Sequence, residues 1–459
     1  MEKRNIIFTS VITSFITTFM GSALNLSIPD LETEFNADAK TVGWVVTIYM
    51  LTCASLAVPF GRIADKINRK KILALGTLIF SVSSAFAAIS WKMWVLLAFR
   101  LLQGVGASMI FCTNIAILVG AFDDSHRGRV LGYSTCANYA GLSAGPVLGG
   151  ILNYNFGWRS LFISTAVISV VALYWIICKL PKGEYQENSI RNVSDGINNR
   201  DIEGNISFVV SIVMMMYGLS TLKSVNIAPF ILGAGIIVFI VFIRIELKTE
   251  NPVVNVRMFK DNLPYCLSNF AALLNYGSTF SVSYLLSIYL QVIKDYTSQR
   301  AGLLLITSTV VMAVISPIAG RISDKFSPYM LSSVGMALCA GSLGLLAFLP
   351  SDAGTIQIIV ILFISGAGSA LFSSPNTNAV MASVGRKDYS VASSILSTMR
   401  SVGHTASMAV VTAVVSLKLG DSSLSDAEPG ILMETIHTAF LIFALLCVIG
   451  IFMALKRKT

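Results

Sequence analysis

The stretch GRIADKINRKK occupies residues 61–71, and its first six letters return as GRISDK at 320–325. Five of the six positions are identical between the two copies, and each copy lies at the end of a long apolar run. One hexapeptide can recur by chance, but recurrence at the same place relative to an apolar run is much less expected. Weak internal symmetry of this kind indicates a chain built from two related halves.

The composition of the chain places these halves in a lipid bilayer rather than in water. Of the 459 residues, 54% are hydrophobic and only 12% are charged, and the mean hydropathy is +0.74. A soluble protein carries about 25% charged residues. Because too few polar residues remain to cover an aqueous surface, we expect an all-α membrane protein whose main partner is the lipid bilayer.

Fourteen segments are long and apolar enough for a membrane-spanning helix, which takes about 20 residues. They lie at 6–28, 41–60, 72–91, 93–120, 130–152, 159–178, 206–222, 228–245, 264–290, 301–319, 330–349, 356–378, 389–417 and 432–454. The first segment is longer than the roughly 7–15 apolar residues of a cleavable signal peptide, so we expect it to be retained as a helix.

The two copies of the hexapeptide end the second and the tenth segment, so they lie eight helices apart rather than six. The simplest arrangement is two six-helix bundles with an additional helix pair between them. It predicts an N-terminal bundle at 1–180, a cytoplasmic linker at 181–205, the additional helices at 206–246 and a C-terminal bundle at 247–459.

Lysine and arginine are distributed unevenly between the two sides of the membrane. If the N-terminus is cytoplasmic, 24 of the 33 basic residues fall on the cytoplasmic side and seven outside, while Arg100 and Arg400 lie within helices. Cytoplasmic loops carry such an excess. We therefore expect a multi-pass protein of the cell membrane with both termini in the cytoplasm, and the net charge of +9 requires no nucleic-acid partner.

Signs of enzyme chemistry are missing from the sequence. The seven cysteines lie inside apolar stretches without a CxxC pair, and GVGAS at 104–108 lies within an apolar span, where it is no phosphate loop. The longest polar stretch, at 179–205, is too short for a folded domain. We expect no enzyme activity, no catalytic residues, no metal and no cofactor.

The stretch at 61–71 resembles the cytoplasmic signature between helices 2 and 3 of major facilitator superfamily transporters, and HRGRVLG at 126–132 also suits that family. The resemblance implies a cytoplasmic gate, whose residues here are Gly61, Asp65, Arg69, Arg127, Gly320 and Asp324. Asp65 is placed to bind orphan backbone amides and to pair with Arg69 or an opposing Arg. Asn68 stands where the family usually has Gly, and Asn tolerates left-handed backbone geometry. A solvated loop that only sets topology is the alternative.

The run RLLQGVGAS at 100–108 resembles a second signature of the family, in its fourth helix. A mid-membrane Arg costs about 2.5–3.5 kcal/mol on insertion scales, so Arg100 should face the bundle interior or a wet cavity. Arg100, Gln103 and Asn114 fall on one helical stripe. The resemblance implies that this Arg handles protons; the alternative is a structural Arg between helices.

The run GLSAGPVLGG at 141–150 resembles the signature of antiporters in the superfamily. Gly141, Gly145 and Gly149 repeat every four residues and form one smooth helix face for close packing, and Pro146 invites a bend. With Gly150 they make up the motif. The resemblance implies the drug:proton antiporter branch with fourteen helices, which includes multidrug and tetracycline exporters. A generic packing face would look similar.

Proton coupling is where the sequence departs from this branch. Helix 1 of the branch often carries an acid where Met20 stands here, and no Asp or Glu lies near the middle of any predicted helix. His404, one turn from Arg400, is the only deep titratable alternative; a structural, hydrogen-bonding histidine is the other reading of this residue. The candidate substrate and proton pathway consists of Arg100, Gln103, Asn114, Asn138, Asn269, Tyr276, Tyr284, Arg400 and His404.

The sequence thus predicts a secondary active transporter that exports small amphiphilic, drug-like molecules by alternating access, with proton-coupled antiport. We expect a monomer whose substrates are neutral, zwitterionic or anionic as often as cationic. A facilitator or uptake porter of the same fold, or a flippase for lipids or amphiphiles, is the alternative, because the usual coupling carboxylate is missing.

Overall fold

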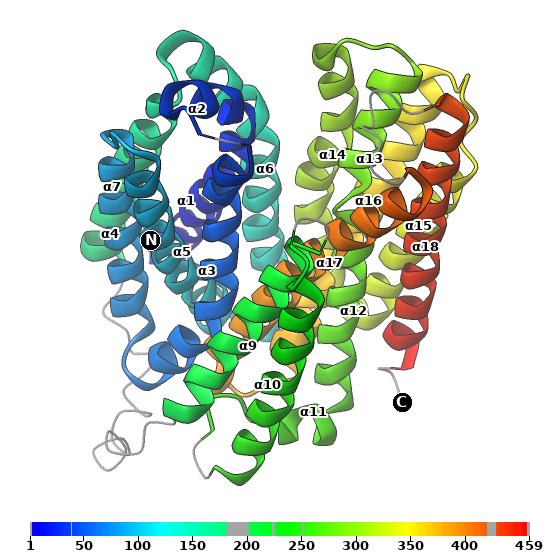
Figure 1. Cartoon of the computed structure of the whole chain (residues 1–459). Coiled ribbons are helices and arrows are strands. Elements are labelled where there is room, and N and C mark those ends of the chain that lie inside the picture. Colours follow the sequence, from blue (N-terminus) through cyan, green and yellow to red (C-terminus); the bar gives the residue numbers. More distant parts are fainter. Residues whose placement is uncertain are drawn as a thin grey trace.

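The computed structural model describes residues 2–37, 39–180, 202–222, 225–249, 252–419 and 428–456. Within these ranges the regular structure is entirely helical, and long helices stand side by side in two groups (Figure 1). The predicted all-α fold is confirmed. Residues 181–201, most of the predicted linker at 181–205, lie outside the described residues.

The first group begins at the N-terminus. It contains α1 (Glu2–Ala23), η1 (Leu24–Ser27), α2 (Ile28–Phe35), α3 (Ala39–Lys66), α4 (Arg69–Ala88), α5 (Met93–Gly120), η2 (Asp124–His126), α6 (Arg127–Phe156) and α7 (Arg159–Lys179). Asn68 starts α4 as an N-cap, because its side chain accepts a hydrogen bond from the Lys71 amide at 3.1 Å. Its φ of −172° is extended, so Asn68 does not adopt the left-handed geometry that Asn tolerates.

The helix pair α9 (Ile202–Ser220) and α10 (Ala228–Lys248) follows, and then the second group. That group contains α11 (Arg257–Asp261), α12 (Leu263–Thr279), α13 (Val282–Ile288), η3 (Tyr289–Ile293), α14 (Ser298–Lys325), α15 (Pro328–Ala347), α16 (Thr355–Ala382), η4 (Arg386–Asp388), α17 (Tyr389–Leu419) and α18 (Pro429–Leu455).

The predicted span at 264–290 is a broken helix rather than a continuous one. The amide of Ser281, between α12 and α13, donates to the Ser407 hydroxyl of α17 at 3.2 Å, outside the helical hydrogen-bond ladder. The segment then ends in the π-helix η3. Breaks and π-turns of this kind often accompany functional sites.

Each of the fourteen predicted segments coincides with a helix or with this broken helix. Among the described residues, eleven helices are long and apolar enough to cross a membrane. The others are α12, which has only 17 residues, and the long helices α6 and α17. Both α6 and α17 are rich in Gly, Ser and other small polar residues, which suits helices that face protein rather than lipid.

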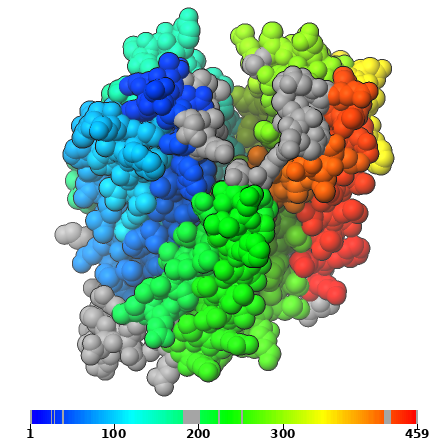
Figure 2. Space-filling model, viewed as in Figure 1, coloured from blue at the N-terminus to red at the C-terminus, as the bar shows by residue number. Residues whose placement is uncertain are grey.

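The two groups meet where α6 packs on α14 and where α17 packs on α3 and α5. The α9–α10 pair lies across the α3–α17 side, because α9 contacts both helices and Tyr217 stacks on Trp44 of α3. The surface is hollowed between the groups at the upper end of Figure 2, away from α9 and α10. The closed end therefore lies below and the hollow end above.

Candidate functional site

Both copies of the repeated hexapeptide lie at the closed end of the molecule. We call this end, where α3 leads into α4 and α14 leads into α15, the motif face. Asp65 accepts hydrogen bonds from the amides of Ser390 and Val391 at 3.2 and 3.0 Å, at the start of α17. Arg69 pairs with the same carboxylate at 2.6 Å. A carboxylate at a helix N-terminus satisfies orphan amides and complements the helix dipole, so Asp65 joins the two groups.

The second copy repeats this contact in the opposite direction. Asp324 accepts hydrogen bonds from the amides of Gly128 and Arg129 at 2.6 and 2.9 Å, at the start of α6. The position that corresponds to Arg69, four residues after the aspartate, is Pro328. The two caps are thus related by the repeat, but only the first one carries an arginine.

Glycines let the helices approach backbone to backbone at this face. A Cβ added at Gly320 would lie 2.3 Å from the Gly128 carbonyl oxygen, and one at Gly61 would lie 2.8 Å from that of Ser390. Distances under 3 Å are closer than Cβ atoms come to other atoms. Both glycines were predicted from the sequence, but Gly128 and Gly132, whose added Cβ atoms would meet the backbone of α14, were not.

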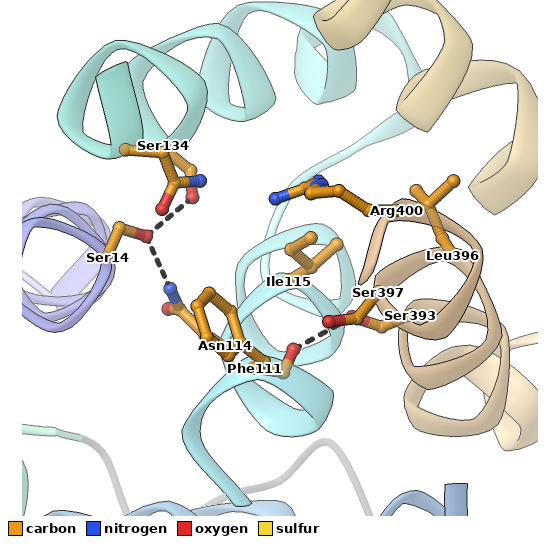
Figure 3. A pocket seen from close by; sticks show the side chains of 10 residues that line it. Ser14, Phe111, Asn114, Ile115, Ser134, Ser393, Leu396, Ser397 and Arg400 are labelled. Carbon is orange, nitrogen blue, oxygen red and sulfur yellow. Dashed lines mark hydrogen bonds between the residues drawn. The ribbon is translucent and has the colours of Figure 1, made fainter. Parts of the chain in front are cut away.

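A small pocket lies deeper in the seam between the groups, with room for little more than a water molecule. It is lined by Ser14, Phe111, Asn114, Ile115, Ser134, Asn138, Ser393, Leu396, Ser397 and Arg400, from α1, α5, α6 and α17 (Figure 3). Asn114 donates to Ser14 at 2.8 Å, and the Ser14 and Ser134 hydroxyls lie 3.0 Å apart. One wall is therefore a fixed hydrogen-bond network.

Arg400 forms the opposite wall of the pocket, and the figure shows its guanidinium directed across the space toward Ser134 (Figure 3). Two polar atoms at this pocket, Arg400 Nε and Asn138 Oδ1, are buried without a hydrogen-bond partner. The lining contains no carboxylate, so Arg400 is its single charged group. A half-buried guanidinium whose Nε lacks a partner, in a lining without an anion, favours a group that brings negative charge or acceptor oxygens.

An aromatic cluster adjoins Arg400. Its guanidinium carbon lies 5.0 Å from the ring centre of Tyr276, and the Tyr276 hydroxyl lies 2.9 Å from that of Ser373. His404, the next turn of α17, stacks on Phe280 at 4.2 Å and meets Tyr276 edge to face at 5.6 Å. The structure therefore brings Arg400, His404 and Tyr276 together, and Asn114 and Asn138 lie on the other side of the pocket.

The sequence profile of the Major Facilitator Superfamily matches residues 10–249 and 268–459. The chain belongs to this superfamily. A solved structure with the same fold is that of the human organic anion transporter MFSD10, with a TM-score of 0.69 and 14% identity, covering 97% of this chain and 100% of that one. At this identity the likeness concerns the fold alone.

Several relatives of this major facilitator protein carry the names of transporters or resistance proteins. The riboflavin transporter RibZ of Clostridioides difficile is 28% identical over 447 residues, which cover 97% of this chain and 96% of the relative. The multidrug resistance protein Stp of Mycobacterium tuberculosis is 25% identical over 403 residues, which cover 86% of this chain and 72% of the relative. The methylenomycin A resistance protein of Bacillus subtilis is 25% identical over 405 residues, which cover 86% of this chain and 84% of the relative. The resemblance to the drug-efflux branch is confirmed.

Arg100 and Gln103 lie apart from the pocket, inside the first group. Arg100 is fully buried; it donates to the Val45 carbonyl at 2.8 Å and to Gln103, and its guanidinium carbon lies 4.4 Å from the Tyr49 ring centre. Gln103 in turn donates to Ser84 at 2.6 Å. These partners belong to α3, α4 and α5, so in this state Arg100 holds neighbouring helices of one group together.

The remaining residues of the predicted pathway are dispersed. Asn269 is fully buried and bonds to the Tyr265 carbonyl one turn earlier, whereas Tyr284 on α13 is 41% exposed. Of the predicted antiporter motif, Gly141, Gly145 and Gly149 face α1, against which the helix packs, while Pro146 is exposed and Gly150 half-buried. None of the five residues of the antiporter motif lines the pocket.

Hydroxyl residues of the seam were not among the residues predicted from the sequence. Ser393 donates to the Phe111 carbonyl at 3.0 Å and Thr398 donates to the Ala54 carbonyl at 3.1 Å, both between groups. Ser393 and Ser397 are one turn apart and share the α17 face that lines the pocket. This four-residue serine spacing beside Arg400 is the signal that was available in the sequence.

Proposed function

We propose that this chain is a secondary active exporter of small amphiphilic molecules, working as a monomer by alternating access between residues 1–180 and 247–459. The motif face is cytoplasmic in this proposal, as are both termini. The observation that carries it is the pocket at the seam, whose walls come from both groups, with a closed motif face below and a hollow above. Such a site can be exposed to either side by rocking the halves.

The pocket chemistry favours neutral or anionic amphiphiles over cations. Arg400 is the single charged group of the lining, whereas a site for lipophilic cations would be expected to supply a carboxylate. Among the relatives, the riboflavin transporter is named for a neutral, planar amphiphile. Riboflavin and its anionic 5′-phosphate are therefore suitable probes that share one ring system and differ in charge.

Replacing Arg400 with glutamine should reduce transport of the phosphate ester much more than transport of riboflavin. A hydrogen bond to a charged group contributes about 1.5–3 kcal/mol, which corresponds to a loss of about 10–100-fold. Uptake of both probes into everted membrane vesicles, with methyl viologen as a dication, measures the effect. Arg400→Lys keeps the charge and should retain most of the phosphate-ester transport. Equal losses for all three probes would contradict a charge-selective role.

Proton coupling is tested by the pH gradient across the same vesicles. We propose that His404 carries the proton, since it borders the pocket cluster and no carboxylate lines the pocket. His404→Gln should then abolish gradient-driven accumulation of riboflavin while exchange of labelled for unlabelled riboflavin persists. His437→Gln is the control, because His437 bonds to the Leu349 carbonyl away from the pocket.

A facilitator or uptake porter is the second candidate, and the missing carboxylate favours it. The same vesicles separate the two candidates. Equilibration of riboflavin that ignores the gradient in the unaltered protein would rule out antiport. Accumulation in right-side-out vesicles, rather than in everted ones, would rule out export.

A further inference from the structure

The starts of α6 and α17 occupy equivalent positions in the repeat. Asp324 binds the amides of residues 128 and 129, and Asp65 binds those of residues 390 and 391. Each aspartate thus accepts hydrogen bonds from the amides of the second and third residues of a helix. Each of these helices directly follows a 3-10 turn, η2 before α6 and η4 before α17. In this register Arg127, the first residue of α6, corresponds to Tyr389, the first residue of α17.

These two corresponding residues contact each other across the seam. Arg127 Nη2 donates to the Tyr389 hydroxyl at 3.2 Å, and the guanidinium carbon lies 5.9 Å from the ring centre. Arg127 is 7% exposed and Tyr389 3% exposed. The contact therefore lies between the two aspartate caps, at the centre of the closed motif face.

A second arginine of the first group reaches the same ring. The guanidinium carbon of Arg69 lies 5.7 Å from the Tyr389 ring centre, while its nitrogens bind Asp65 and the Ser390 hydroxyl. Tyr389 therefore meets two cations of the opposite group, and cation–π attraction is stronger where water is excluded. An arginine at position 389, as in the other repeat, would instead add a third positive charge here.

Opening of the motif face would leave these cations with partners of their own. Arg127 also pairs with Asp124, and Arg69 with Asp65, both within the first group. When the groups separate, Tyr389 loses both guanidinium contacts, and the Ser390 hydroxyl and the Arg386 carbonyl lose Arg69, whereas each guanidinium keeps its own carboxylate. A contact that forms and breaks without stranding a buried charge can act reversibly.

We infer that Tyr389 is a positioning residue that latches the closed motif face by engaging Arg127 and Arg69 of the opposite half. The inference rests on the alternating access proposed above, and it adds a central contact to the two aspartate caps. The phenol ring should contribute most of this stabilisation, because both cations contact the ring. The hydroxyl should contribute less, because among the described residues it bonds to Arg127 alone.

The distance between Ile67 and Phe326 measures the state of the latch. Both residues are exposed on the motif face, two positions after each aspartate, and they belong to opposite halves. Spin labels at cysteines placed there, in a background without the native cysteines, report closed and open populations by pulsed electron resonance. Labels at Tyr154 and Phe348 report the opposite end in the same way.

Tyr389→Leu should shift the populations toward an open motif face by about tenfold, whereas Tyr389→Phe should shift them about threefold or less. The opposite-end labels should move closer together as the motif face opens. Tyr296→Leu is the matched control, because Arg300 lies 3.9 Å from the Tyr296 ring centre within one half. It should leave the motif-face distance unchanged.

Arg127→Met tests the same contact from its other side, without a substitution at Tyr389. If the two residues act as a pair, Arg127→Met combined with Tyr389→Leu shifts the populations less than the product of the single shifts. Unchanged distances in Tyr389→Leu, or an equal shift in Tyr296→Leu, would overturn the inference. Labels that switch as expected in a protein that moves no probe would overturn the exporter proposal and leave the latch standing.

Discussion

Replacing Gly320 with valine should prevent the motif face from closing and abolish transport. The added Cβ would lie 2.3 Å from the Gly128 carbonyl oxygen and 3.0 Å from the Gly132 Cα, so backbone rather than a flexible side chain blocks it. Overpacking of this kind costs about 1–3 kcal/mol or more, which moves a two-state equilibrium by about 5–150-fold or more. The spin labels at Ile67 and Phe326 should report an open motif face, and vesicle uptake of riboflavin should fall to background.

Gly302 provides the control within the same helix. It is exposed near the start of α14, and an added Cβ there would meet nothing within 4 Å. Gly302→Val therefore changes the helix propensity of α14 in the same way without touching the other half. It should keep the closed distance and most of the transport. A Gly320→Val protein that closes normally would show that closure of the motif face does not require this close approach of α14 to α6.

Hydropathy, charge sidedness and the repeat at 61–66 and 320–325 predicted the helical fold, because these signals depend on local sequence. The gate residues were predicted from the family resemblance, and their role stays a prediction. None of these signals predicted which helix each aspartate caps. The pairing of each aspartate with a helix depends on how the two halves pack against each other, and local sequence signals do not determine that packing. Tyr389 was not predicted for the same reason. Its correspondence to Arg127 is visible only when the starts of α6 and α17 are compared through the aspartates that cap them.

The polar stripe on α5 shows the limit of periodicity. Arg100 and Asn114 share one face of the helix, but 14 residues of helix span about 21 Å. They therefore lie at different depths: Arg100 binds Val45 inside the first group, while Asn114 reaches the pocket. Periodicity gives the face of a helix, whereas the neighbours at each depth come from tertiary packing. Arg400 reached the pocket because α17 crosses the seam at that depth.

Replacing Gly145 with alanine should destabilise the protein, and replacing Ser22 with glycine should compensate. The added Cβ would lie 1.9 Å from Ser22 Oγ and 2.9 Å from Ser22 Cβ, so α1 and α6 must move apart. The expected loss is about 1–3 kcal/mol, seen as a lower unfolding temperature in detergent. Ser22→Gly removes both contacts and leaves the Ala23 nitrogen at 3.0 Å, so the double variant should recover most of the loss.

Gly341→Ala on α15 is the control, because an added Cβ there meets nothing within 4 Å and should not lower the unfolding temperature. The double variant also decides what the antiporter-like glycines do. They face α1 and not the pocket, so packing alone predicts that stability and riboflavin transport return together. Recovery of stability without transport would instead mean that this helix pair must slide or bend during the cycle, beyond fitting tightly in one state.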